Sequence, residues 1–136
     1  MELDEARAFI RKNHRAVLVT LRSDGDLQTS PVTVGIDDRG RAEISSRETA
    51  FKVKNLRRDP RATLCVFNDG FFGEWVQVDG RAGISSTPEA LEGLVEYYRR
   101  ISGEHPDWDE YRSVMQKEKR VLIQIDLEHA GPDRSG

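Results

Sequence analysis

Short stretches of alternating hydrophobic and polar residues dominate the chain, and turn-forming residues separate them. Such alternation is typical of half-buried β-strands. The Asp-Gly in "RSDGDLQ" and the glycine in "DDRGR" predict tight antiparallel turns after the first two of these stretches. The pattern therefore predicts six mainly antiparallel strands, over residues 16–21, 27–36, 42–45, 62–68, 74–84 and 120–127.

Hydrophobic residues at helical spacing predict helices between these strands. One helix comes first, over residues 3–10, and another follows Thr49, a good N-cap, so that its helical positions begin near Ala50. Pro88 is placed at the first position of a further helix. Residues 102–119 then predict a loop and a last helix. The helix after Pro88 carries an apolar stripe of Leu91, Leu94, Val95 and Tyr98.

Six strands joined by turns or single helices favour a closed antiparallel barrel, because closure removes the exposed edges of an open sheet. The helices are expected to flank this barrel, which makes the fold class mainly β with α+β character. A chain of 136 residues can bury one real core and is too short for two ordinary domains. We therefore expect a single domain over residues 1–136.

The charge of the chain limits its partners. The formal net charge is −3, and a general nucleic-acid or membrane-surface binder is usually basic overall. No apolar run approaches the length of a membrane span. Aromatic residues that could stack on bases are not interleaved with the basic residues. We expect a soluble, cytoplasmic protein that binds neither nucleic acid nor membrane.

Positive charge is concentrated where the second helix is predicted to begin. Residues 47–61 hold six Lys or Arg against two Asp or Glu. Arg47, Lys52 and Lys54 crowd the start of this helix, and only Glu48 opposes them locally. A cation is mildly unfavourable there, because the amino end of a helix carries a partial positive charge. Two interpretations stay open: a solvated basic face, or a pocket for a phosphate or carboxylate.

Other chemistry finds little support in the residues. His14, His105 and His129 are far apart and share no ligand spacing, so no metal site is expected. The single cysteine, Cys65, excludes an internal disulfide and is expected to pack in the core. The chain has no Gly-x-Ser-x-Gly, Walker or dinucleotide-binding motif. No catalytic residue is therefore predicted.

Four segments carry a resemblance to a known family: "GDLQTSPVTVGID", "ISSRETAFKVKNLRRDPRATLCV", "EWVQVDGRA" and "SGEHPDWDEYR". Together they resemble the split β-barrel flavin and deazaflavin oxidoreductases, the pyridoxamine 5′-phosphate oxidase-like superfamily, over nearly the whole chain. "KVKNLRRDPRA" is shared widely in that superfamily. "SGEHPDWDEYR" is similar to the branch that uses the deazaflavin coenzyme F420. The resemblance implies a six-stranded split barrel and a homodimer with the cofactor groove between its subunits.

The resemblance also implies where the cofactor lies. Its phosphate is expected at the start of the helix after the third strand, at Ser45, Ser46, Arg47, Lys52, Lys54 and Asn55. Its ring system is expected against the second and fifth strands, at Gln28, Ser30, Pro31, Val32, Trp75 and Gln77. For Trp75, packing in the core stays open as the alternative. Arg57, Arg58 and Arg61 either serve the glutamate tail of F420 or form a solvated rim.

The chain departs from true pyridoxamine phosphate oxidases on one strand. Those enzymes carry Arg-Gln-Val-Arg where this chain has "EWVQ", which argues against their activity and weakens the case for FMN. The resemblance thus implies an F420-dependent reductase that passes hydride to a small organic acceptor, such as an activated C=C bond or a tetrapyrrole. An FMN-binding relative and a non-catalytic cofactor carrier are the alternatives. The cofactor would supply the reactive chemistry, so the absence of a catalytic motif is expected.

Overall fold

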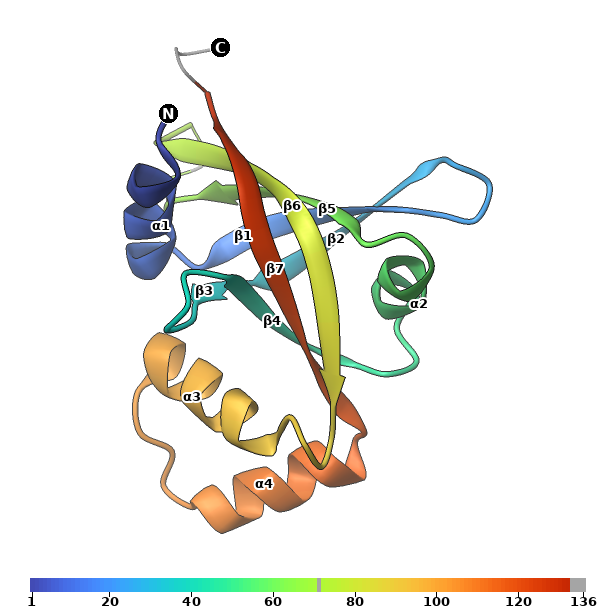
Figure 1. Ribbon diagram of the computed structural model, residues 1–136. Helices are drawn as coiled ribbons and strands as arrows, with labels where there is room; N and C mark the ends of the chain where they lie inside the picture. Colours follow the sequence, from blue (N-terminus) through green and yellow to red (C-terminus); the bar gives the residue numbers. More distant parts are fainter. Residues whose placement is uncertain (71, 133–136) are drawn as a thin grey trace.

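The computed structural model describes residues 1–70 and 72–132 of the chain. Its strands are β1 (Arg15–Leu21), β2 (Leu27–Thr33), β3 (Gly35–Ile36), β4 (Ala42–Arg47), β5 (Arg61–Phe67), β6 (Trp75–Ser86) and β7 (Arg120–Gly131). Its helices are α1 (Leu3–Lys12), α2 (Phe51–Arg58), α3 (Leu91–Ser102) and α4 (Trp108–Lys117) (Figure 1). Among the described residues, no helix has both the length and the apolar character that crossing a membrane requires.

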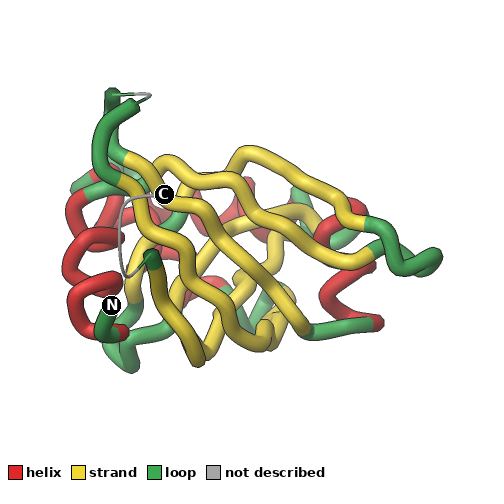
Figure 2. The backbone as a smooth tube through the Cα atoms, turned by 90° about the horizontal axis from the view of Figure 1, so that it is seen from above, coloured by secondary structure: helices red, strands yellow, loops and turns green. Residues whose placement is uncertain are grey.

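All strands belong to one antiparallel sheet with the order β2-β1-β5-β6-β7-β4-β3. The sheet is strongly curled (Figure 2). As a result, β2 comes back into contact with β4 without pairing to it. The helices lie outside the curled sheet (Figure 1). This arrangement is the split β-barrel fold that the family resemblance implies. The closed barrel expected from the strand pattern is not formed, because β2 and β4 are not paired.

The structure has seven strands instead of six because the predicted strand over residues 27–36 is divided at Val34. Its first part pairs with β1, whereas Gly35 and Ile36 pair with β4. The N–H of Val34, a buried residue, donates to the carbonyl of His14 at 2.8 Å, which satisfies the backbone at the crossing. At Gly35 a Cβ would lie 3.2 Å from Cδ1 of Ile101, so the absence of a side chain allows α3 to approach closely.

One predicted cap and one predicted helix start are wrong, whereas α2 begins at Phe51, next to the expected position near Ala50. Thr49 does not cap α2, because Ala50 is the N-cap residue and no side chain bonds to that end of the helix. Helix α3 begins at Leu91, three residues after Pro88, because residues 87–90 form a turn in which the Ala90 N–H donates to the Ser86 carbonyl. The last predicted helix is confirmed as α4, where Asp107 accepts a hydrogen bond from the Glu110 N–H at 3.1 Å.

Strand β7 has two buried faces. Val121, Ile123 and Ile125 belong to the core of the barrel, whereas Leu122 packs into a separate cluster with α3 and α4. The alternation predicted for this strand is therefore confirmed, with the difference that Leu122 on the outer side is covered as well.

Cys65 does not lie in the core, which corrects the prediction for this residue. It is half-buried and alternates with the buried residues Leu64 and Val66 along β5, so it lies on the outer face of the sheet. Its cross-strand neighbours are Val17 and Gln77. Partial burial raises the pKa of the Cys65 thiol, which keeps it in the unreactive protonated form.

The segment "SGEHPDWDEYR" packs α4 against α3. Its rings surround Tyr98 of α3 at centroid distances of 5.1 to 5.7 Å, and they belong to His105, Trp108 and Tyr111. The Tyr111 hydroxyl also donates to the Leu94 carbonyl at 3.0 Å. Edge-to-face aromatic pairs of this kind add to the energy of burial. The described part of this motif thus has a structural role in joining the two helices.

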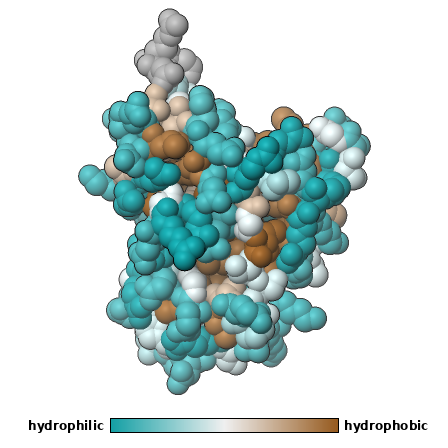
Figure 3. All heavy atoms as spheres, in the orientation of Figure 1, coloured by the Kyte–Doolittle hydropathy of each residue, from teal (hydrophilic) through white to brown (hydrophobic). Residues whose placement is uncertain are grey.

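Apolar surface also gathers beside α2. Figure 3 shows a largely hydrophilic face with apolar surface between β6 and α2. Ala82 and Ile84 of β6 are partly exposed beside α2, whose residues Leu56 and Val53 are buried against the sheet. These contacts fix α2 against the sheet and set the position of its amino end.

An ion pair holds α3 on β4. Arg100 donates from Nη1 to both carboxylate oxygens of Glu43, at 3.1 and 3.0 Å, and its Nη2 lies 3.1 Å from Asp38. Glu43 is only 1% exposed. Burial raises the pKa of Glu43 to about 7, although Arg100 pulls it down. The carboxyl therefore binds a proton more readily in the folded chain than in the unfolded chain.

This pKa predicts how stability depends on pH. Because the pKa of Glu43 rises from 4.5 to about 7 on folding, its contribution is most favourable below pH 4.5 and is lost as pH rises through 7. The unfolding free energy of the wild type, relative to Glu43→Gln, should fall over this interval by up to about 3 kcal/mol. Urea denaturation of both proteins from pH 4.5 to 8 measures this difference. A constant or rising difference contradicts the prediction.

Candidate functional site

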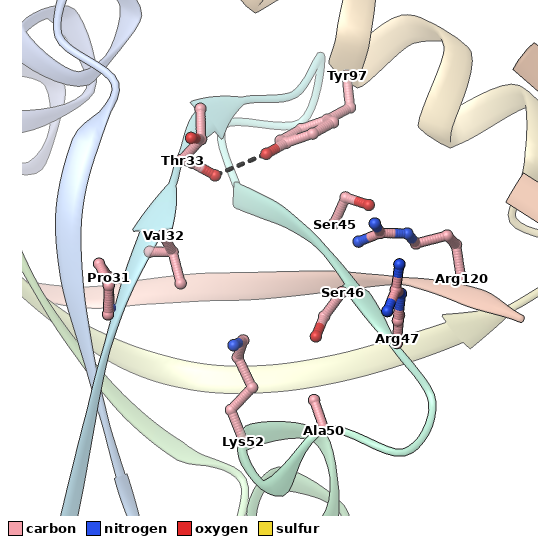
Figure 4. Close-up of a pocket in the computed structure, with 10 residues that line it drawn as sticks. All are labelled: Pro31, Val32, Thr33, Ser45, Ser46, Arg47, Ala50, Lys52, Tyr97 and Arg120. Carbon is pink, nitrogen blue, oxygen red and sulfur yellow. Dashed lines mark hydrogen bonds between the residues drawn. The ribbon is translucent and has the colours of Figure 1, made fainter. Parts of the chain in front are cut away.

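A cavity of about 570 Å³ lies where β2 and β4 meet the amino end of α2. It opens at the place where the curled sheet is not closed by pairing. Figure 4 shows the side chains that surround it. They are Pro31, Val32, Thr33, Ser45, Ser46, Arg47, Ala50, Lys52, Tyr97 and Arg120.

Six of the predicted cofactor residues line this cavity: Pro31, Val32, Ser45, Ser46, Arg47 and Lys52. Pro31 lies on a strand at one end of the sheet order, where its missing N–H leaves no ladder bond unmade. The cavity thus brings a β2 wall together with a cationic wall from β4 and α2.

Thr33, Ala50, Tyr97 and Arg120 also line the cavity and were not predicted. Thr33 and Ala50 are sequence neighbours of predicted residues, so proximity along the chain was the available signal. Tyr97 comes from α3, and Arg120 begins β7 opposite Arg47. The register between β4 and β7 brings Arg120 next to Arg47. A local sequence pattern cannot predict this register, because the two strands are far apart in the sequence.

The amino end of α2 has hydrogen-bond donors without acceptors. Among the described residues, the backbone N–H groups of Phe51 and Lys52 have no partner, and no acidic residue lies in the first turn. The Lys52 ammonium points into the cavity and is likewise unpaired in the described chain. Glu48 does not neutralise it, because Glu48 accepts a hydrogen bond from Arg57 at 2.7 Å. Free N–H groups beside a cation form a site that suits an anion.

Arg47 and Arg120 face each other across the β4–β7 pair. Glu118 lies between them: its Oε1 accepts a hydrogen bond from Nε of Arg120 at 2.9 Å and lies 3.6 Å from Nη2 of Arg47. The hydrogen bond from Arg120 is the main cause that lowers the pKa of Glu118. The carboxylate is therefore ionised, and this part of the cavity retains a net positive charge.

Tyr97 connects α3 to β2 across the cavity. Its hydroxyl donates to the carbonyl of Thr33 at 2.7 Å (Figure 4). Burial raises the pKa of Tyr97 to about 12, so the phenol remains a neutral donor. This bond holds the carboxyl end of β2 beside α3.

The predicted residues Gln28, Ser30, Lys54 and Asn55 do not line the cavity. Asn55 is buried, and its Nδ2 donates to Thr20 at 3.1 Å and to Gln28 at 2.6 Å. Lys54 is exposed on α2, with its ammonium 5.6 Å from the centre of the Phe51 ring. Asn55 and Gln28 therefore join α2 to the sheet.

Trp75 and Gln77 lie on the outer face of the sheet. Gln77 stands in one cross-strand row with Pro31, Val17 and Cys65. Trp75 is 37% exposed, so the alternative of core packing is wrong for this residue. Within one chain neither residue reaches the cavity.

The three arginines considered for a glutamate tail are engaged elsewhere. Arg57 pairs with Glu48, Arg58 donates to the Leu21 carbonyl at 2.7 Å, and Arg61 donates to both oxygens of Asp59. The hydrogen bonds from Arg61 lower the pKa of Asp59 to about 2. None of the three lines the cavity, which favours the solvated rim.

The curled sheet and the cationic cavity at the amino end of a helix define a split β-barrel protein of the pyridoxamine 5′-phosphate oxidase-like class. Residues 3–131 match the family described as pyridoxamine 5′-phosphate oxidase. The chain belongs to this family.

Individual relatives extend the comparison. The chain is 26% identical over 126 residues to an F420H2-dependent biliverdin reductase from Mycobacterium tuberculosis, covering 92% of this chain and 83% of the relative. A conserved hypothetical protein from the same species has a similar structure, with a TM-score of 0.76, 25% identity and coverage of 100% and 92% of the two chains. A haem storage protein from Vibrio cholerae matches at a TM-score of 0.71 and 14% identity, over 96% and 94%, which shows a shared fold alone.

The Tyr97 bond gives a prediction about stability. Tyr97→Phe leaves the Thr33 carbonyl without its partner and should lower the unfolding free energy by about 1 kcal/mol. Tyr98→Phe is the matched control, because the Tyr98 hydroxyl has no hydrogen bond to the described residues while its ring is similarly packed. Chemical denaturation compares the two variants. Equal effects would mean that the hydroxyl of Tyr97 does not hold β2.

Proposed function

We propose that the chain binds reduced F420 in this cavity and passes hydride to a small organic acceptor, such as an activated C=C bond or a tetrapyrrole. One observation carries the proposal. The Lys52 ammonium points into the cavity without a partner in the described chain, beside the uncapped start of α2. An anion at this point relieves the unfavourable placement of a cation at a helix start.

The donors around the cavity fit a phosphate group. Ser45 and Ser46 supply hydroxyls, Arg47 and Lys52 supply positive charge, and α2 supplies free N–H groups. Phosphate oxygens accept several such bonds at once, and bonds to an ionised acceptor are about twice as strong as neutral ones. Asn55 contributes indirectly in this proposal, through the position of the helix, whereas Lys54 lies outside the cavity.

The chain's own residues orient the cofactor and exclude water. Pro31 and Val32 form an apolar wall next to the cationic one, which suits a flat ring attached to a charged tail. A bound deazaflavin supplies hydride transfer from its ring carbon. The residues of the cavity therefore have to position the cofactor ring against the acceptor for hydride transfer. The proton that completes the reduction of the acceptor would come from solvent, so no acid–base pair is required of these residues.

The similarity to an F420H2-dependent biliverdin reductase supports this choice of cofactor and acceptor class. FMN is the alternative, because its phosphate suits the same donors. A non-catalytic carrier is the second alternative, and the shared fold with a haem storage protein keeps it open. Titration of the purified chain with F420 and FMN side by side, followed by a hydride-transfer assay with biliverdin, separates the three.

We also propose a homodimer in which the outer sheet face forms the interface. The apolar stripe of α3 cannot supply this surface, since Leu94 and Val95 are buried against α4 within the chain. The outer face instead presents half-buried or exposed apolar residues in adjoining rows, namely Val17, Val19, Pro31, Cys65, Phe67 and Trp75. A second copy covering this face would bring its Trp75 and Gln77 toward the cavity, where one chain alone does not place them.

Substitution of Lys52 tests the phosphate site. Lys52→Glu removes a charge-assisted hydrogen bond and sets a carboxylate against the phosphate, which should weaken F420 binding by about 3 kcal/mol or more. Lys54→Glu is the matched control, with the same charge change on the same helix outside the cavity. Both variants without cofactor should be as stable as the wild type, or more stable by some tenths of a kcal/mol. Fluorescence titration and thermal melts measure both effects. Equal affinities of the two variants would refute the site.

A charge on the outer sheet face tests the dimer. Val17→Lys places an ammonium at the centre of the proposed interface, and it should convert the dimer to a monomer and weaken cofactor binding at least tenfold. The side chain is only half-buried within one chain, so the fold should tolerate the change. Ser113→Lys, on the exposed side of α4, is the control. Sedimentation together with titration decides it. A monomer with undiminished affinity would exclude a shared groove.

A further inference from the structure

We infer that Arg47 and Arg120 form a second anion subsite of the cavity, which takes a carboxylate carried by the ligand close to its phosphate. Glu118 fills this subsite from within the chain until the ligand binds. The inference rests on the proposed function only in placing a phosphate beside Lys52. It names a ligand class, a phosphate ester with a neighbouring carboxylate.

The first argument is the pairing of two like charges. Arg47 and Arg120 are direct partners in the β4–β7 register. Directly opposite residues on paired strands have Cβ atoms about 4.5–5.5 Å apart, and like charges there are destabilising. Both arginines line the same cavity, and Figure 4 shows their guanidinium groups gathered beside Ser45 and Ser46. The Arg47 side chain is 59% exposed, so solvent screens part of this repulsion, and an anion between the two guanidinium groups would relieve the rest.

The second argument is that Glu118 meets this need only in part. One oxygen, Oε1, serves both arginines, at 2.9 Å from Arg120 and at a longer 3.6 Å from Arg47. The Arg120 side chain makes no other hydrogen bond among the described residues, so both of its Nη groups remain available. Arg120 is also three-quarters buried, with 26% of its side chain exposed. A partly buried guanidinium whose Nη groups have no partner in the described chain can bind a further carboxylate in the two-bond geometry that arginine favours.

The third argument is the charge of the whole cavity. Arg47, Lys52 and Arg120 bring three positive charges, and Glu118 is the single carboxylate that contacts them in the described chain. A phosphate beside Lys52 leaves Arg47 and Arg120 with Glu118 alone. A carboxylate tethered to that phosphate has a high effective concentration at the arginine pair, so it competes well with Glu118.

The experiment compares two small probes that need no deazaflavin. Glycerol 3-phosphate and 3-phosphoglycerate have the same chain length and phosphate, and they differ by the carboxylate. Calorimetric titration of the wild type should show about tenfold tighter binding of 3-phosphoglycerate. Arg120→Gln should abolish this preference and leave the affinity for glycerol 3-phosphate within about twofold.

Glu118→Gln should change the affinity for 3-phosphoglycerate in the opposite direction from Arg120→Gln. It removes the competing carboxylate, so the affinity for 3-phosphoglycerate should rise about threefold or more. Glu92 and Arg112 give matched controls, since they form an ion pair at 2.9 Å between α3 and α4 outside this cavity. Glu92→Gln and Arg112→Gln change the net charge equally and should leave the preference unchanged.

Each result has one meaning. Equal binding of the two probes to the wild type overturns the carboxylate subsite and leaves the phosphate pocket standing. Failure of both probes to bind overturns the pocket itself, and the proposed function with it. If Glu92→Gln raises the affinity for 3-phosphoglycerate as much as Glu118→Gln does, net charge explains the effect and the subsite is overturned. The subsite is also overturned if Arg120→Gln weakens the binding of both probes equally. Melts of every variant confirm that it is folded.

Discussion

The pairing of β4 with β7 is the interaction on which the site depends. Its register sets Arg47 opposite Arg120, so residues far apart in the sequence share one wall of the cavity. The two arginines repel each other, but they cannot separate because the backbone ladder fixes both strands. The buried residues Val121, Ile123 and Ile125 hold β7 in place from the barrel side. Burial of each such side chain is worth about 1.5–3 kcal/mol, well above the repulsion of a partly solvated like-charge pair.

The opening between β2 and β4 is the second constraint. The chain changes partners at Val34, so β2 leaves the ladder of β1 at one end of the sheet order and β3 joins β4 at the other. The two strands then touch without pairing, which leaves room for a ligand where a closed barrel would have hydrogen bonds. Tyr97 spans this opening through the Thr33 carbonyl. The same irregularity that adds a seventh strand thus makes space for the cavity.

Features that depend on neighbouring residues could be predicted from the sequence, and those that depend on register could not. The alternation in β1 and β5 predicts these strands correctly, because one face of each is buried. In β7 the residues that face the barrel, Val121, Ile123 and Ile125, carry the same signal. The concentration of cations at the start of α2 could also be predicted, because Arg47 and Lys52 are close along the chain. Arg120 reaches Arg47 only through strand pairing, and Tyr97 reaches Thr33 only through the docking of α3. Cys65 was misplaced because an apolar strand pattern does not say which of its two faces meets the core.

The two buried faces of β7 have a consequence for how this family can change over time. Leu122 is the residue of β7 that belongs to the cluster of α3 and α4, whereas its neighbours Val121 and Ile123 belong to the barrel. Substitutions that reshape the helix pair therefore need not disturb the packing beneath the cationic wall, and the reverse also holds. Such a division lets descendants of one ancestor vary the helices beside the opening while inheriting the wall unaltered. Variation of the helix pair beside a constant cationic wall is the evolutionary pattern that this architecture permits.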